Sequence, residues 1–160
     1  DICGLALSGG DTGLVATYFT NVFGPGDRSS RSTNTLIRKM LAGEAPALIK
    51  GDHPHDWTYI DDAVGGMIAA AEKGRDGGSY YVGSRKPALF RDIVGRVRDV
   101  VAPGMALEFG TYALENHIDY TRFDLDALWR DAGFECRCDF DDSIRKTAQW
   151  LKELDSRGNQ

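Results

Sequence analysis

Apolar side chains along this chain follow two patterns, one with helical spacing and one of short, continuous runs. Apolar positions three and four residues apart are typical of helices with one buried face, and they predict helices at residues 33–43, 63–73, 90–101, 125–132 and 142–154. Short β-branched or aromatic runs predict strands at residues 14–19, 47–49, 58–60, 79–82 and 107–109. Tryptophans fall within these patterns and are expected in the core: Trp57, Trp129 and Trp150. Alternating strands and helices predict an α/β fold.

Small and acidic residues mark the expected ends of the helices. Asp61 or Asp62 is expected to cap the helix at 63–73, and Asp124 the helix at 125–132, because a carboxylate accepts the unpaired amides of a first turn. Residues 1–8 are interpreted as the end of a helix, and residues 155–160 as a frayed tail. We expect residues 1–160 to form a single region.

Composition limits the function classes. The chain has 160 residues and a formal net charge of −5, which argues against non-specific binding to nucleic acid, because that needs a dense basic face. No window approaches the roughly 18 uninterrupted apolar residues of a membrane span, and no signal-peptide pattern is visible. These features predict a soluble, cytoplasmic protein.

Cysteine and histidine usage gives no sign of a metal centre. The cysteines, Cys3, Cys136 and Cys138, are odd in number and lack zinc spacing, so we interpret them as packing residues. His53 and His55 in HPH have no third ligand at suitable spacing nearby.

Two glycine-containing segments are candidates for anion binding. The stretch Gly9–Gly13 follows a predicted helix and precedes a strand, which is the reverse of a dinucleotide loop, so it is interpreted as a connector. The second, "TNVFGPGDRSSRS", leaves a strand through Asn21 and carries Arg28 and Arg31. Ligands of α/β proteins bind at the ends of strands, so this loop is the preferred candidate.

The order of motifs resembles the extended short-chain dehydrogenase/reductases that act on nucleotide sugars. The family's "N-V-Y-G-P-G" is "TNVFGPGD" here, and its "R-D-[FW]-x-Y-V-x-D" is "HDWTYIDD". "SYYVGS", "DLDALWRDAGF" and "DDSIRKTAQWL" match three further blocks in the family's order. The resemblance covers nearly the whole chain and implies an α/β, Rossmann-type fold.

By that resemblance the chain is the C-terminal, substrate-binding lobe, with a few strands that belong to the parallel nucleotide-binding sheet. The family's NAD loop and Tyr-x-x-x-Lys pair would lie before Asp1, so no catalytic residue is expected here and the chain alone is expected to be inactive. The resemblance implies NAD or NADP as cofactor, a nucleotide-sugar substrate, an epimerase or dehydratase reaction, and a homodimer for the full-length enzyme.

The resemblance also suggests site residues. Asn21 corresponds to a residue that bonds the substrate's diphosphate, and Arg31 lies where several members place a basic residue near phosphate. Ile49 is in the segment that stacks near the nucleotide base, His55 replaces a phosphate-binding arginine, and Tyr18 is a candidate cofactor contact. An ordinary Asx turn at Asn21 remains an alternative interpretation.

Departures from the family leave other functions open. A neutral imidazole at His55 cannot supply a guanidinium's charge and paired donors, so the substrate itself could differ. Alternatives are a nucleotide-sugar 4-reductase, a non-catalytic binding module, and an NAD(P)-binding regulator that kept the fold without the reaction.

Overall fold

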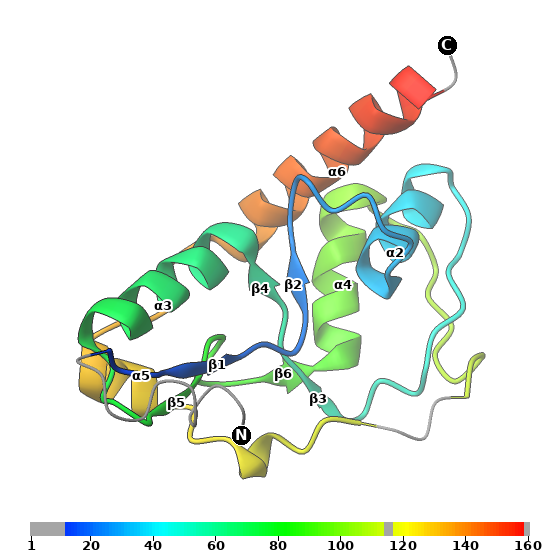
Figure 1. Cartoon of the computed structure of the whole chain (residues 1–160). Coiled ribbons are helices and arrows are strands. Elements are labelled where there is room, and N and C mark those ends of the chain that lie inside the picture. The colour runs from blue at the N-terminus through cyan, green and yellow to red at the C-terminus, as the bar shows by residue number, and fades with distance from the viewer. Residues whose placement is uncertain (1–11, 114–116, 159–160) are drawn as a thin grey trace.

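The computed structural model describes residues 12–113 and 117–158 and shows the predicted α/β fold (Figure 1). The strands are β1 (Ala16–Tyr18), β2 (Val22–Phe23), β3 (Pro54–His55), β4 (Thr58–Tyr59), β5 (Ser79–Tyr81) and β6 (Ala88–Leu89). The helices are α2 (Ser32–Leu41), α3 (Ile60–Lys73), α4 (Phe90–Val101), α5 (Ala127–Ala132) and α6 (Phe140–Gly158), with a 3₁₀ turn at Tyr120–Arg122. The expected helix at 1–8 and Cys3 lie outside the described residues.

The strands of the described residues pair two by two. β1 pairs with β5 in parallel, and β2 pairs with β4 in parallel. β3 pairs with β6 in antiparallel register, with His55 opposite Ala88. The strands expected at 47–49 and 107–109 are reduced to one bridge, between Leu48 and Phe109. β1 and β2 are consecutive along the chain but belong to different parallel pairs, so the connection from β1 to β2 links the two pairs.

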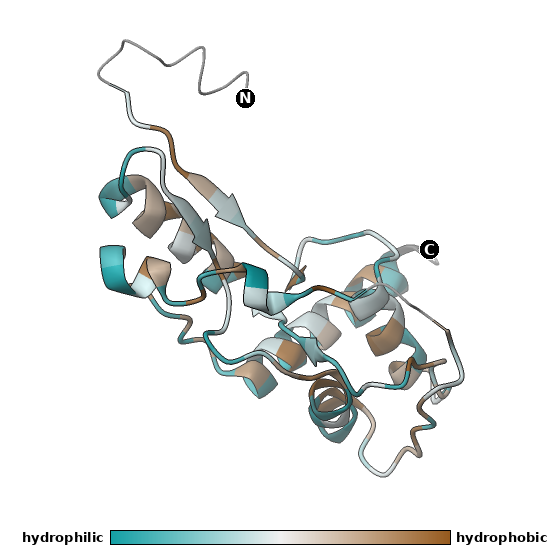
Figure 2. Ribbon diagram, turned by 90° about the horizontal axis from the view of Figure 1, so that it is seen from below, coloured by the Kyte–Doolittle hydropathy of each residue, from teal (hydrophilic) through white to brown (hydrophobic). Residues whose placement is uncertain are grey.

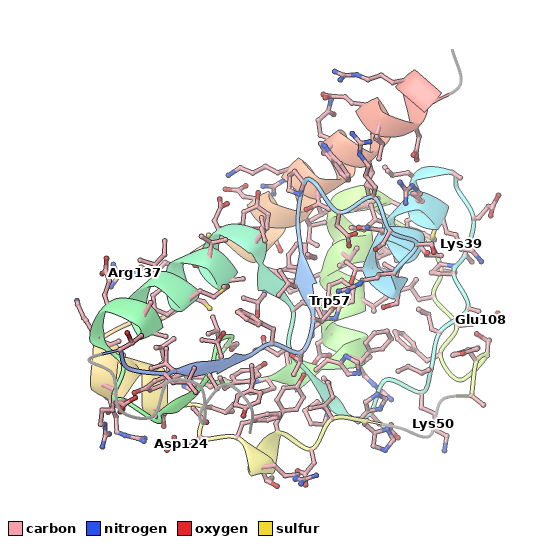
Figure 3. The ribbon with its side chains drawn as sticks, viewed as in Figure 1. Lys39, Lys50, Trp57, Glu108, Asp124 and Arg137 are labelled. Carbon is pink, nitrogen blue, oxygen red and sulfur yellow. The ribbon has the colours of Figure 1, made fainter. Side chains whose placement is uncertain are left out.

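Two clusters of buried side chains hold these elements together. The larger one joins α2, α4 and α6 to β2 and β4, and includes Phe23, Ile37 and Trp57. Trp57 lies in the interior between β2 and α4, whereas the labelled charged side chains lie at the periphery (Figure 3). The smaller cluster joins α3 and α5 to β5 around Tyr80. The helices carry both apolar and polar residues, as amphipathic periodicity predicts (Figure 2).

Helix starts are where the sequence-based expectations were wrong. α3 begins at Ile60, and its N-cap residue is Tyr59, so Asp61 and Asp62 lie in the first turn and do not cap it. Instead, the Asp62 carboxylate accepts hydrogen bonds from the backbone amides of Arg137 and Cys138, at 2.9 and 3.1 Å. Asp62 therefore ties the start of α3 to the segment before α6.

The other differences are at the second half of the chain. α5 begins at Ala127 with Asp126 as its N-cap residue, two residues later than expected, and the Asp124 carboxylate accepts from the backbone amide of Asp126 at 3.2 Å in the turn that leads into the helix. α6 continues to Gly158, so the tail expected at 155–160 is helical for most of its length (Figure 1). Trp129 is 47% exposed and Cys138 is exposed, so neither is the core residue that the patterns predicted.

Within the described residues, no helix combines the length and apolar character needed to cross a membrane.

Candidate functional site

A buried polar network joins the carboxyl end of β1 to that of β5. The Tyr81 hydroxyl donates to the Asp56 carboxylate at 2.6 Å, and the backbone amide of Ser84 donates to the same oxygen at 2.6 Å. Thr20 Oγ1 lies 3.0 Å from the Tyr81 hydroxyl and accepts from the Tyr120 hydroxyl at 3.2 Å. The Tyr120 oxygen in turn accepts from the backbone amide of Asp56 at 2.8 Å. Through these hydrogen bonds the residue after β1, Thr20, is joined to Tyr81 in β5, to Asp56 and to Tyr120.

Burial sets the electrostatics of the network. Asp56 is 4% exposed, and burial raises the pKa of its carboxyl, while the donors from Tyr81 and Ser84 partly oppose that rise. Burial, followed by the charge of Asp56, raises the pKa of the Tyr81 hydroxyl. A Cβ on Gly83 would lie 2.2 Å from the Asp56 carboxylate, so only glycine lets the chain pass this close. The network therefore fixes the Asp56 carboxylate against Tyr81 and Ser84 in the protein interior.

Asn21 sits at the junction of the two parallel strand pairs. Its backbone carbonyl accepts from the Thr58 amide at 2.9 Å, which continues the β2–β4 pairing. Its side-chain amide donates to Thr33 Oγ1 at 3.0 Å, in the first turn of α2. The side chain is thus not engaged in a turn with its own backbone. A primary amide has two donors and an accepting oxygen, so Asn21 retains hydrogen-bonding capacity beyond this contact.

The N-terminus of α2 follows the loop that carries Arg28 and Arg31. Its N-cap residue, Arg31, makes no side-chain capping bond, and no acidic residue lies in the first turn. The loop that leads into it is held by the buried amide of Asn34, which donates to the carbonyls of Asp27 and Ser29 at 2.8 and 3.1 Å. Unsatisfied amides and the helix dipole favour negative charge at such an end. Arg31 adds a positive, exposed side chain at the same place.

A cavity of about 300 Å³ lies beside β3 and β4. Its wall includes His55, Trp57, Thr58 and Tyr59. The Thr58 hydroxyl is buried and has no hydrogen-bond partner among the described residues. We expected a single concave surface bounded by Asn21, Arg31 and His55, but only His55 is among the residues that line this cavity.

The remaining predicted residues, Tyr18 and Ile49, lie apart from the cavity. Tyr18 is 47% exposed at the end of β1 and borders an open hollow that also includes His117 and Arg122. Ile49 is 8% exposed, so it is largely enclosed by the protein. As the structure stands, its side chain offers little surface to a nucleotide base.

Cysteine and metal chemistry find no support here. Burial raises the pKa of the Cys136 thiol to about 12, so little of the reactive thiolate forms near neutral pH. In residues 12–113 and 117–158, no group of His, Cys, Asp and Glu side chains could hold a metal ion.

Sequence reasoning missed the network residues Thr20, Tyr81 and Tyr120, and the role of Thr33. Asp56 was visible only as the middle residue of "HDW", where a single acid before an apolar strand is a usable signal of a buried partner. The tyrosines carried no such signal, since aromatic residues in strands are normally core.

Comparison with known proteins places these features in context. The family described as "NAD dependent epimerase/dehydratase family" matches residues 7–83. The protein named "Probable dTDP-glucose 4,6-dehydratase" from Sinorhizobium fredii is 31% identical over 128 residues, which are 75% of this chain and 35% of that protein.

Solved structures show the same fold. The Bordetella bronchiseptica enzyme WbmF, crystallised with NAD⁺ and UDP, is 27% identical with a TM-score of 0.70, over 89% of this chain and 47% of its own. The UDP-glucuronic acid 4-epimerase of Bacillus cereus in complex with NAD has a TM-score of 0.74 at 19% identity, over 96% of this chain and 48% of its own. The chain spans about a third of the first relative and about half of each solved chain.

Proposed function

The chain belongs to the NAD-dependent epimerase/dehydratase family, and from that membership and the site we infer that it forms the substrate-binding part of a nucleotide-sugar enzyme. In that role it holds a sugar nucleotide by its diphosphate and nucleoside while hydride transfer takes place at the sugar. The reaction is that of an NAD(P)-dependent epimerase or dehydratase.

One observation carries this proposal: the uncapped N-terminus of α2 lies beside Asn21. Thr33, in the first turn of α2, accepts the Asn21 amide, so the helix end and the end of β1 are held together. On this proposal the backbone amides of the first turn of α2, the Asn21 amide and Arg31 act together on the diphosphate. Comparable helix ends bind phosphate in many α/β proteins.

We assign the other predicted residues on weaker grounds. His55 would contact the substrate from the end of β3, and Ile49 would lie behind the nucleoside. NAD or NADP would be held mainly by parts of the protein outside this chain. Tyr18 fits a cofactor contact because its half-exposed ring stands at the carboxyl end of β1, where a flat ring can stack on it.

Substrate affinity of an Asn21 variant tests the proposal. We expect Asn21→Ala in the full-length protein to weaken binding of UDP-glucose or dTDP-glucose by about 5- to 150-fold, which corresponds to roughly 1–3 kcal/mol for a hydrogen bond to a charged group. Isothermal titration calorimetry measures the affinity, and thermal melting of each variant shows how much stability is lost.

Thr33→Val is the matched control. It removes the hydroxyl that Asn21 contacts but keeps the Asn21 amide available to a ligand. If Asn21 binds the diphosphate directly, Thr33→Val keeps most of the affinity. Equal losses of affinity in both variants, each with an equal loss of stability, would mean that Asn21 only braces α2. Failure of the wild-type protein to bind either nucleotide sugar would refute the proposed function itself.

A further inference from the structure

Two candidate substrate residues are chain neighbours of residues in the buried hydrogen-bond network. Asn21 directly follows Thr20, and His55 directly precedes Asp56. Asn21 and His55 are half-buried, so each keeps some surface that a ligand can reach. Thr20 Oγ1 lies 3.3 Å from the Asp56 carbonyl oxygen, so the two backbone segments meet at this point. Contacts that fix Thr20 and Asp56 therefore also fix the places from which Asn21 and His55 extend.

Tyr120 reaches both network residues with one hydroxyl. Its oxygen accepts from the Asp56 backbone amide at 2.8 Å, and its proton is donated to Thr20 Oγ1 at 3.2 Å. Tyr120 follows Asp56 by 64 residues and Thr20 by 100 residues, so it belongs to neither of the two segments. It is 7% exposed, and water therefore cannot easily replace its hydroxyl. A single buried phenol bridges the segment of Asn21 and the segment of His55.

The protons of the network run in one direction. A backbone amide can only donate, so the Tyr120 oxygen accepts from Asp56 and its own proton goes to Thr20. The Tyr81 proton goes to the Asp56 carboxylate at 2.6 Å, which leaves the Tyr81 oxygen to accept from Thr20 at 3.0 Å. These hydrogen bonds form a ring that begins and ends at Asp56. Because hydrogen bonds in such a series polarise one another, removal of one hydroxyl weakens the others.

The amide that Tyr120 accepts belongs to the peptide group between His55 and Asp56. This hydrogen bond is buried, and a buried amide without an acceptor costs free energy. If the Tyr120 hydroxyl is removed, the peptide group turns toward another acceptor or toward water, and the backbone at His55 moves with it. Tyr120 thus fixes the peptide group from which His55 extends.

Thr20 provides the corresponding fixed point before Asn21. On its other side Asn21 is already held, because its carbonyl accepts from the Thr58 amide at 2.9 Å. The bond from Tyr120 holds the Thr20 side chain against Asp56, so the backbone is fixed immediately before Asn21 as well. Asn21 therefore depends on Tyr120 for one of its two neighbouring anchors.

We propose that Tyr120 is a positioning residue for ligand binding, whose hydroxyl sets the placement of Asn21 and His55 relative to each other. Tyr120 touches no ligand in this role and acts only through Thr20 and the amide of Asp56. The inference rests on the proposed function for the identity of the ligand, whereas the placement of Asn21 and His55 can be measured without one.

Tyr120→Phe in the full-length protein tests this role, because it removes the hydroxyl and keeps the ring. We expect the affinity for UDP-glucose and dTDP-glucose, measured by calorimetry, to fall by about 3- to 30-fold, since a misplacement of about 1 Å costs up to about 100-fold and smaller shifts cost less. NMR of the ligand-free protein should show shifted signals of the Asn21 side-chain amide and the His55 ring.

Tyr80→Phe is the matched control. The Tyr80 hydroxyl also accepts from a backbone amide, that of Arg75 at 2.7 Å, and donates to the Asp131 carboxylate at 3.0 Å. The ring is 1% exposed, and its hydroxyl joins neither Thr20 nor Asp56. Its removal should lower stability but leave the affinity and the NMR signals unchanged. Equal affinity losses in Tyr80→Phe and Tyr120→Phe would overturn the proposal.

Combination with Asn21→Ala shows whether Tyr120 acts through Asn21. If it does, Tyr120→Phe costs clearly less affinity in the Asn21→Ala protein than in the wild type, because the placement of a missing amide no longer matters. An affinity loss in the double variant equal to the product of the two single fold-losses would mean that the residues act independently, and it would overturn the proposal.

Calorimetry and NMR together distinguish this inference from the proposed function. Binding of a nucleotide sugar with the same affinity in the wild type and in Tyr120→Phe supports the proposed function and overturns the positioning role. Shifted Asn21 and His55 signals, without binding of either nucleotide sugar by the wild type, support placement by Tyr120 and refute the ligand. Unshifted signals and no binding overturn both.

Discussion

Replacing Tyr81 with phenylalanine removes the hydroxyl that donates to the buried Asp56 carboxylate while keeping the ring. The two oxygens are 2.6 Å apart, Tyr81 is 3% exposed and Asp56 is 4% exposed, so water cannot easily replace the lost donor. A hydrogen bond to a charged group is worth about 1.5–3 kcal/mol, so Tyr81→Phe should lower the free energy of unfolding by that amount. For a chain of this size the melting temperature should fall by about 3–12 °C.

The loss should depend on pH in a defined direction. Burial raises the pKa of Asp56 in the folded state above 3.8, so the unfolded state holds the ionised carboxylate more readily. The buried charge therefore costs stability above the folded-state pKa, and that cost is relieved as the pH falls through it. Because the Tyr81 hydroxyl stabilises the ionised form, Tyr81→Phe should be most destabilising at neutral pH and less so in acid.

The neighbouring tyrosine provides the control for this measurement. The Tyr80 hydroxyl also donates to a carboxylate, that of Asp131 at 3.0 Å, but Arg75 holds the pKa of Asp131 below its usual range. Urea unfolding at two pH values measures the loss in the free energy of unfolding for Tyr80→Phe and for Tyr81→Phe. An equal loss at both pH values for Tyr81→Phe, or a larger loss in acid, would refute the account of Asp56.

Two further predictions concern packing and acid stability. A Cβ on Gly66 would lie 2.3 Å from Val82 Cγ1, so Gly66→Ala should destabilise the protein by about 1–3 kcal/mol through overpacking of α3 against Val82, the residue after β5, as measured by chemical denaturation. The control, Gly95→Ala on α4, has open space at the new Cβ and should be neutral or stabilising. The folded-state pKa of His55 is about 4 against 6.5 for a free imidazole, so the unfolded state binds the proton first and stability falls between these values as the pH drops. His55→Gln should show a smaller fall over that range in urea unfolding, and an unchanged fall would exclude His55 as its cause.

The sequence alone was sufficient for the fold class, for the family and for the long helices. α4 begins at Phe90 and ends at Val101 as predicted, because apolar residues at Ile93, Val94 and Val97 specify one buried face over several turns. The ordered motif blocks predicted the family correctly, since their order along the chain is itself a strong constraint.

Other features depended on partners far along the chain. β2 and β3 are two residues long, too short for any periodic signal, and they exist because they pair with Thr58–Tyr59 and Ala88–Leu89. Asp62 resembles a helix cap in sequence, but its carboxylate accepts hydrogen bonds from the amides of a distant segment instead. A local sequence pattern does not show which distant amides reach a carboxylate.

For the candidate site, too, the sequence indicated some residues and only the tertiary structure showed their contacts. The sequence by itself indicated Asn21 and the loop that leads to Arg31, because turn residues and arginines after a strand are a local signal. Only the tertiary structure decided that Asn21 contacts Thr33, that Asp56 is buried against Tyr81, and that His117 stacks on His53. The physical reason is that hydrogen-bond partners and ring contacts are set by proximity in space, which the chain reaches only after its strands pair and its helices pack on them.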